Sequence, residues 1–261
     1  MTEPSRRFDR AASFYDRTRA LPDGAMAELV GRLVGELARR GPALEIGVGT
    51  GRIGLPLHAA GIAMAGVDLS VPMMEVLIEK GGGRPPFPLA RADATSLPFP
   101  ADRFGAAVAS HVFHLIPSWR DAIDELVRVV RSGGVVLSSG RERDDGSVAT
   151  LVQRHFVAET GLARTSIGAR HDGTDVAEAF ARHGAQERVL RPVHISRTIT
   201  VGAVLHELES NQWSWTWSLP DDVVHRAAAL TRSWAETEIG PLDAEHLVET
   251  QVSWRAYELP A

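Results

Sequence analysis

One glycine-rich stretch, residues 43–57, constrains the fold of this chain more than any other part of its sequence. An apolar run with one acidic residue leads into closely spaced glycines, and apolar residues at helical spacing follow. This pattern predicts a buried strand that turns sharply into a helix. The start of that helix would present N–H groups and the positive end of its dipole to a ligand. The stretch therefore predicts an α/β fold with a nucleotide-like cofactor in the turn.

The glycine spacing alone leaves the identity of the cofactor open. Residues 49–54 match the dinucleotide fingerprint G-x-G-x-x-G, which would indicate a nicotinamide-dependent oxidoreductase. Glu45, however, places a carboxylate at the mouth of the turn, where it would repel a pyrophosphate. A cofactor with an ammonium group and no phosphate, such as S-adenosylmethionine (SAM), suits that charge better. A turn whose glycines serve only packing is a third alternative.

Composition excludes several classes of chemistry. The chain has no cysteine, so thiol nucleophiles and cysteine-ligated metals are impossible. Its only lysine, Lys80, stands in neither a Walker loop nor a Tyr-x-x-x-Lys pair. The net charge of −5 gives no electrostatic basis for binding nucleic acid. No 18-residue apolar run predicts a membrane span, and the polar start of the chain leads us to expect a cytoplasmic enzyme.

Apolar runs and amphipathic stretches alternate up to residue 140, which predicts parallel strands joined by helices. After residue 140 the pattern becomes mainly helical, with two late strands. The expected strands are 62–67, 88–92, 104–110, 135–139, 187–199 and 247–257, and the expected helices are 8–20, 24–40, 119–130, 147–160, 174–183, 201–209 and 221–238.

The motif Glu45-x-Gly47-x-Gly49-x-Gly51 resembles motif I of the class I SAM-dependent methyltransferases, especially the small-molecule group that includes quinone C-methyltransferases. Residues 66–70, 92–99 and 131–134 are similar to later segments of that family. The resemblance implies a Rossmann-like, doubly wound, seven-stranded, mostly parallel sheet with an antiparallel last strand and a helical cap inserted near the C-terminus. The expected single domain comprises an N-terminal lid and helix (1–40), a SAM-binding core (41–140), the rest of the core (141–199 and 245–261) and the cap (200–244).

The resemblance also implies how SAM, and its product S-adenosylhomocysteine (SAH), would be bound. Asp68 would accept both ribose hydroxyls, although it could instead cap the next helix. Asp93 would accept from the adenine amine, with the N–H of Ala94 on a ring nitrogen, unless it is only a turn aspartate. The expected cofactor contacts in and around these strand ends are Glu45, Gly47, Gly49, Gly51, Asp68, Leu69, Met73, Asp93, Ala94 and Ser110.

Two further segments are candidates for a role around the reacting methyl group. The N-terminal segment resembles one that folds over SAM, with Tyr15 against the sulfonium and Arg19 on the methionine carboxylate, or it is a solvated helix face. His111 and His114, after the fourth strand, are candidates for a general base, or they fill space beside the cofactor. No third ligand accompanies them, so we expect no metal.

The acceptor is expected to be a small hydrophobic or aromatic molecule. Trp213, Trp215 and Trp217 alternate, so an extended segment would point all three to one side. Trp213 and Trp217 are our candidates for lining an acceptor pocket. Alternatively, the tryptophans anchor the cap helices onto the core. The prediction is thus a SAM-dependent methyltransferase, monomeric or homodimeric, acting on a small molecule. A nicotinamide-dependent oxidoreductase and a SAM-binding protein without methyltransferase activity remain the alternatives.

Overall fold

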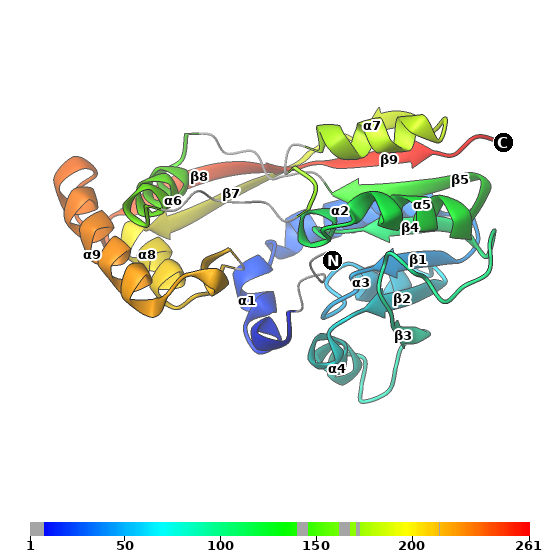
Figure 1. Ribbon diagram of the computed structural model, residues 1–261, viewed down its shortest axis with the longest axis horizontal. Helices are drawn as coiled ribbons and strands as arrows, with labels where there is room; N and C mark the ends of the chain where they lie inside the picture. Colours follow the sequence, from blue (N-terminus) through cyan, green and yellow to red (C-terminus); the bar gives the residue numbers. More distant parts are fainter. Residues whose placement is uncertain (1–7, 140–145, 162–167, 171–172, 214) are drawn as a thin grey trace. The chain divides into compact units, whose positions relative to one another are not determined.

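Figure 1 shows the computed structural model of the chain, which divides into two compact units. The structure describes residues 8–139, 146–161, 168–170, 173–213 and 215–261. Unit 1 consists of Met1–Arg141, Ser166–Val193 and Val252–Ala261, and unit 2 consists of Glu142–Thr165 and His194–Gln251.

Unit 1 is built on a seven-stranded sheet with the strand order β3-β2-β1-β4-β5-β9-β6. The first five strands are parallel to one another, and β9 runs antiparallel to both of its neighbours, β5 and β6. This confirms the expected mostly parallel sheet with an antiparallel last strand. The strands are β1 (Ala43–Ile46), β2 (Met64–Asp68), β3 (Leu89–Arg91), β4 (Phe104–Ala109), β5 (Val130–Ser139), β6 (Gln186–Val189) and β9 (Trp254–Glu258).

The central strands are covered on both faces, because every residue of β1 and β4 is buried. Helices α2 and α3 pack together, as do α5 and α7, and in Figure 1 α2 lies behind the sheet and α5 in front of it. The helices of unit 1 are α1 (Tyr15–Arg19), α2 (Asp23–Leu37), α3 (Gly54–Ala59), α4 (Val71–Lys80), α5 (Trp119–Val129) and α7 (Thr174–Arg182), with 3-10 turns η1 (Asp9–Ala11) and η2 (Phe113–Leu115).

Unit 2 packs three helices around an apolar core that includes Phe156, Leu205 and Ala228. The same part of the chain also forms a two-stranded sheet of β7 and β8. The elements are α6 (Val148–Glu159), β7 (Val193–Thr200), α8 (Val201–Glu209), η3 (Thr216–Ser218), α9 (Asp221–Glu238) and β8 (Glu245–Val252).

Three expected elements are each divided in two in the structure. The strand 187–199 is two strands, β6 and β7, because Pro192 lacks the N–H that a continuous ladder needs. The strand 247–257 breaks at Ser253, so only β9 joins the large sheet. The helix 8–20 is divided into η1 and α1. Unit 2 accordingly takes in more chain than the expected cap 200–244, since α6 packs with α8 and α9.

Candidate functional site

The glycine turn between β1 and α3 has the backbone conformation that its sequence requires. Gly49 and Gly51 have φ values of +51° and +76°, which favour glycine over residues with a side chain. A Cβ atom on Gly51 would lie 2.8 Å from the side chains of both Leu55 and Leu77, so there is also no room for one. Gly47 likewise has a positive φ, of +66°. The backbone of the turn is thus closely packed, with no room for a side chain at Gly47 or Gly51.

Asp68 at the end of β2 joins this turn directly. Its Oδ2 accepts a hydrogen bond from the Gly49 N–H at 2.8 Å, and its Oδ1 accepts from the Ser70 N–H at 2.8 Å. Burial raises the pKa of this half-buried carboxyl, and the backbone donors oppose that rise. Each carboxylate oxygen has two lone pairs, so both can accept a further hydroxyl. Ser70, not Asp68, caps α4, because its hydroxyl accepts from Met73 N–H.

The other expected cofactor contacts also lie in unit 1, where they follow the ends of β2 and β3. Asp93, just after β3, accepts from the N–H and the hydroxyl of Thr95, which is the turn arrangement considered as its alternative role. Ala94 is buried and Leu69 half-buried. Met73 is buried, with its Cε 3.2 Å from where a Cβ on Gly49 would stand, so it packs under the turn.

Glu45 is buried rather than open to the mouth of the turn, with only 2% of its surface exposed. Its Oε2 has no hydrogen-bond partner among the described residues, and a Cβ on Gly54 would lie 2.5 Å from that oxygen. Burial raises the pKa of Glu45 to about 8, and the positive charge of Arg52 opposes the rise. The carboxyl group therefore lies against the start of α3, and its expected contact with an ammonium group stays a prediction.

The N-terminal segment is bonded to the glycine turn by Asp16. Its Oδ1 accepts from the Thr50 hydroxyl at 2.6 Å, and its Oδ2 accepts from Lys80 Nζ at 2.9 Å. Lys80 Nζ also donates to the Thr50 carbonyl at 2.8 Å. We call these three residues the Asp16–Thr50–Lys80 cluster. It holds α1 beside the turn, which is where a segment covering the cofactor would lie.

Tyr15 and Arg19 flank this cluster on α1. The ring of Tyr15 makes an edge contact with Phe8, at 6.0 Å between centroids. The Arg19 carbonyl accepts from Arg52 Nη1 at 3.2 Å, and Arg52 Nη2 reaches the Ser110 hydroxyl at 3.5 Å. Arg52 thereby links the N-terminal segment, the turn and the end of β4. The proposed roles of Tyr15 and Arg19 toward SAM stay predictions.

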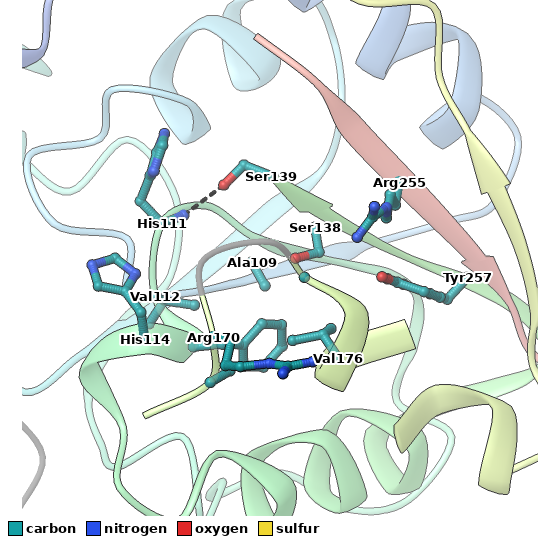
Figure 2. Close-up of a pocket in the computed structure, with 13 residues that line it drawn as sticks. Ala109, His111, Val112, His114, Ser138, Ser139, Arg170, Val176, Arg255 and Tyr257 are labelled. Atoms are coloured by element: carbon teal, nitrogen blue, oxygen red, sulfur yellow. Dashed lines mark hydrogen bonds between the residues drawn. The ribbon is translucent and has the colours of Figure 1, made fainter. Parts of the chain in front are cut away.

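His111 and His114 follow β4 and line a hollow at the carboxyl ends of β4 and β5. His111 has a φ of +50°, uncommon for a residue with a side chain, and its N–H donates to the Ser139 hydroxyl at 2.7 Å. This bond ties the end of β4 to the end of β5. Figure 2 shows both imidazole rings on one side of the hollow, Arg255 and Tyr257 on the opposite side, and Ser138 between them.

The tryptophan segment does not have the extended conformation that the alternation predicted. Trp215 has helical dihedral angles and precedes the turn η3, and the Thr216 N–H bonds back to the Trp213 carbonyl. Trp213 and Trp215 pack against the apolar core of unit 2, and Trp217 Nε1 donates to the Asn211 carbonyl at 2.8 Å. Ser214 lies outside the described residues. The role of Trp213 and Trp217 toward an acceptor stays a prediction.

Sequence reasoning missed four basic residues that the structure places at the site. Arg52 occupies a variable position of the glycine motif, and Lys80 ends the helix after β2. Arg170 and Arg255 line the hollow but come from late parts of the chain, Arg255 from β9. Only Lys80, the single lysine, carried a signal that could have singled it out. The described residues contain no group of three or more metal-ligating side chains. None of the described helices is long and apolar enough to cross a bilayer.

Residues 44–138 match the family model described as a methyltransferase domain. The chain is 36% identical over 118 residues to a phosphatidylethanolamine N-methyltransferase of Cereibacter sphaeroides, covering 44% of this chain and 58% of that protein. It is 33% identical over 134 residues to a demethylmenaquinone methyltransferase of Clavibacter sepedonicus, covering 50% of this chain and 54% of that protein. The chain thus spans little more than half the length of these curated relatives.

Solved structures share the fold at low sequence identity. The YcgJ protein of Bacillus subtilis superimposes with a TM-score of 0.61 at 16% identity, covering 92% of this chain and all of that one. The [4+2]-cyclase SpnF does so with a TM-score of 0.56 at 15% identity over the whole of both chains. The family model and the curated relatives are thus similar to this chain over its first half, and the sheet order agrees with the class I SAM-dependent methyltransferase fold that the motifs predict.

Proposed function

We propose that this protein binds SAM at the carboxyl ends of β1, β2 and β3 and transfers its methyl group to a small molecule. One observation carries the proposal: the Gly49 N–H and a carboxylate oxygen of Asp68 meet at 2.8 Å. This bond brings the glycine turn and the acidic end of β2 to one point. A ribose bound there would have a close-packed backbone on one side and an acceptor for its hydroxyls on the other.

The other expected contacts would bind the remaining parts of SAM on either side of this ribose. Asp93 and Ala94 would bind the adenine edge, and the N-terminal segment with Tyr15 and Arg19 would cover the methionine end. Methyl transfer is an in-line displacement at the sulfonium, so the protein contributes mainly orientation and exclusion of water. His111 and His114 would serve as a base where the acceptor must lose a proton.

Calorimetric titration of the full chain with SAM and SAH tests the proposal. Asp68→Ala should weaken binding by about 1.5–3 kcal/mol for each charged hydrogen bond lost, roughly 10- to 150-fold. Asp121→Asn, which removes an exposed carboxylate from the first turn of α5, is the matched control and should bind normally. Unchanged SAM affinity in Asp68→Ala would remove the ribose assignment.

Two other functions would give different results. A nicotinamide-dependent oxidoreductase would bind reduced nicotinamide dinucleotide, which its absorbance and fluorescence report. A protein that binds SAM without transferring its methyl group would bind SAH. It would not convert SAM into SAH with any candidate acceptor in a metabolite library. The second alternative is worth testing because a [4+2]-cyclase has the same fold.

The finer expectations also belong to this proposal. We expect a cytoplasmic protein that binds no nucleic acid and exists as a monomer or a homodimer. Light scattering on the purified chain measures its mass in solution, and a titration with duplex DNA at low salt tests nucleic-acid binding.

A further inference from the structure

The hollow at the carboxyl ends of β4 and β5 is lined by basic, hydroxyl and apolar side chains. It contains about 490 Å³ of space not filled by atoms, part of it open to solvent. Of the thirteen described residues that line it, two are arginines and none is acidic. Val112, Phe113 and Val176 give it apolar walls. Such a lining suits a small molecule with an apolar body and a negative charge.

Arg255 is held in a fixed position at one side of this hollow. It lies on β9 opposite Ser138 of β5, and its Nε pairs with Glu187 at 2.9 Å. Its Nη1 lies against Gly173, where a Cβ would stand only 2.4 Å away. Gly173 therefore leaves space for the guanidinium. A planar group with several donors, fixed at a cavity wall, is well suited to recognise an oxyanion.

Hydroxyl groups accompany this guanidinium. Tyr257 is 1% exposed, stacks on Phe180 at 4.2 Å between centroids, and lines the hollow. Burial raises the pKa of Tyr257 to about 12, so its hydroxyl keeps its proton at neutral pH. Ser138, 6% exposed, stands between Tyr257 and His111 in Figure 2. Neutral hydroxyls beside a cation add hydrogen-bonding capacity without adding negative charge.

Arg170 adds a second positive charge at the rim. The Ala169 N–H donates to the Phe113 carbonyl at 3.1 Å, which fixes this segment against η2. Arg170 Nε pairs with Asp175 at 2.9 Å, and its Nη2 donates to the Thr174 hydroxyl at 2.7 Å. Its side chain is 63% exposed and paired with Asp175, so its charge is screened, and the defined position at the hollow is that of Arg255.

We propose that the methyl acceptor carries an oxyanion, a carboxylate or a phosphate, which binds at Arg255, Tyr257 and Ser138. This inference rests on the proposed function, because it places the acceptor in the methyltransferase domain. Anchored at that side, the apolar body of the acceptor extends along Val112 and Val176, and its reacting atom lies toward His111 and His114 (Figure 2). Arg255 is then a residue that determines which acceptors bind.

The test is a calorimetric titration of the full, SAH-loaded chain with benzoate, inorganic phosphate and benzamide at constant ionic strength in chloride. We expect benzoate or phosphate to bind with millimolar affinity and at least tenfold more weakly to Arg255→Met. Arg84→Met, which removes an exposed arginine elsewhere in unit 1, should bind like the wild type. Benzamide, the uncharged match of benzoate, should not distinguish the variants. Binding of benzoate alone indicates a carboxylate acceptor, and binding of phosphate alone a phosphate ester.

The outcomes separate this proposal from the proposed function. If SAH fails to bind the wild type, the proposed function is wrong. If SAH binds but the wild type binds neither anion, or binds them as Arg255→Met does, the anion site is wrong while the methyltransferase assignment stands. Should Arg255→Met fail to fold, Arg255→Lys decides, because it keeps the charge but loses the planar fork and should weaken benzoate binding at least threefold.

Discussion

Lys80 offers a direct test of whether the N-terminal segment takes part in cofactor binding. Replacing Lys80 with methionine removes two hydrogen bonds, to Asp16 at 2.9 Å and to the Thr50 carbonyl at 2.8 Å. The side chains of the ion pair are 37% and 40% exposed, so solvent screens them and each bond contributes only about 0.5–1 kcal/mol. Only the bond to Asp16 joins Lys80 to α1, so the docked position of α1 loses about 0.5–1 kcal/mol.

If SAM binds only when α1 is docked, its dissociation constant should rise by at most the same free energy, about 2- to 5-fold. Calorimetry at low and high salt measures this change, and the wild type should approach the variant as salt screens the pair. Lys80→Arg keeps the cation and should bind nearly normally. Glu79→Gln alters a neighbouring exposed charge and serves as the control.

A double-mutant cycle with Asp16→Asn isolates the coupling between the two side chains. Amide hydrogen exchange of residues 15–19 should show faster exchange in Lys80→Met and slower exchange when SAM is added to the wild type. A SAM affinity within twofold of wild type, together with unchanged exchange of residues 15–19, would refute the lid.

Three further outcomes are expected. Burial raises the pKa of Glu45 in the folded protein to about 8 from an ordinary 4.5, so the free energy of unfolding should fall as the pH rises from about 4.5 to 8. Denaturant titrations at pH 5 and pH 8 measure this fall, which should be smaller in Glu45→Gln. Phe156→Ala, which empties a fully buried position of unit 2, should lower the free energy of unfolding by about 3–5 kcal/mol, whereas Leu151→Ala at a 44% exposed position of the same helix should cost under about 1 kcal/mol. His114→Ala should lower turnover, on an acceptor found by screening, more than SAM affinity; the reverse result would make His114 a cofactor contact.

The core of unit 1 was predictable from sequence because its signals are local. Buried strands followed by glycine or by an acidic residue indicate parallel strand ends, and the structure places Gly49 and Asp68 in contact as that pattern requires. Helix α5 was predictable for the same reason, since its buried residues Ala122, Ile123 and Leu126 recur at helical spacing.

The parts that could not be predicted depend on contacts between distant residues. Asp16, Thr50 and Lys80 are 30 or more positions apart, so no local pattern relates them. Arg255 lines the hollow only because β9 pairs with β5 and because Gly173 leaves space for its guanidinium. The tryptophan alternation suggested an extended segment, but Trp213 and Trp215 pack against an apolar core and Trp215 has helical dihedral angles.

The single lysine at the glycine turn also makes the protein its own reporter. Acylating reagents react with neutral amines, and Lys80 is the only lysine side chain in the sequence. While its ammonium group is bonded to Asp16 and Thr50, it should acylate slowly, and any ligand that changes this pairing should change the rate. Mass spectrometry of one peptide would follow it. The absence of cysteine likewise allows a thiol-directed fluorophore to be attached at one introduced position without background labelling.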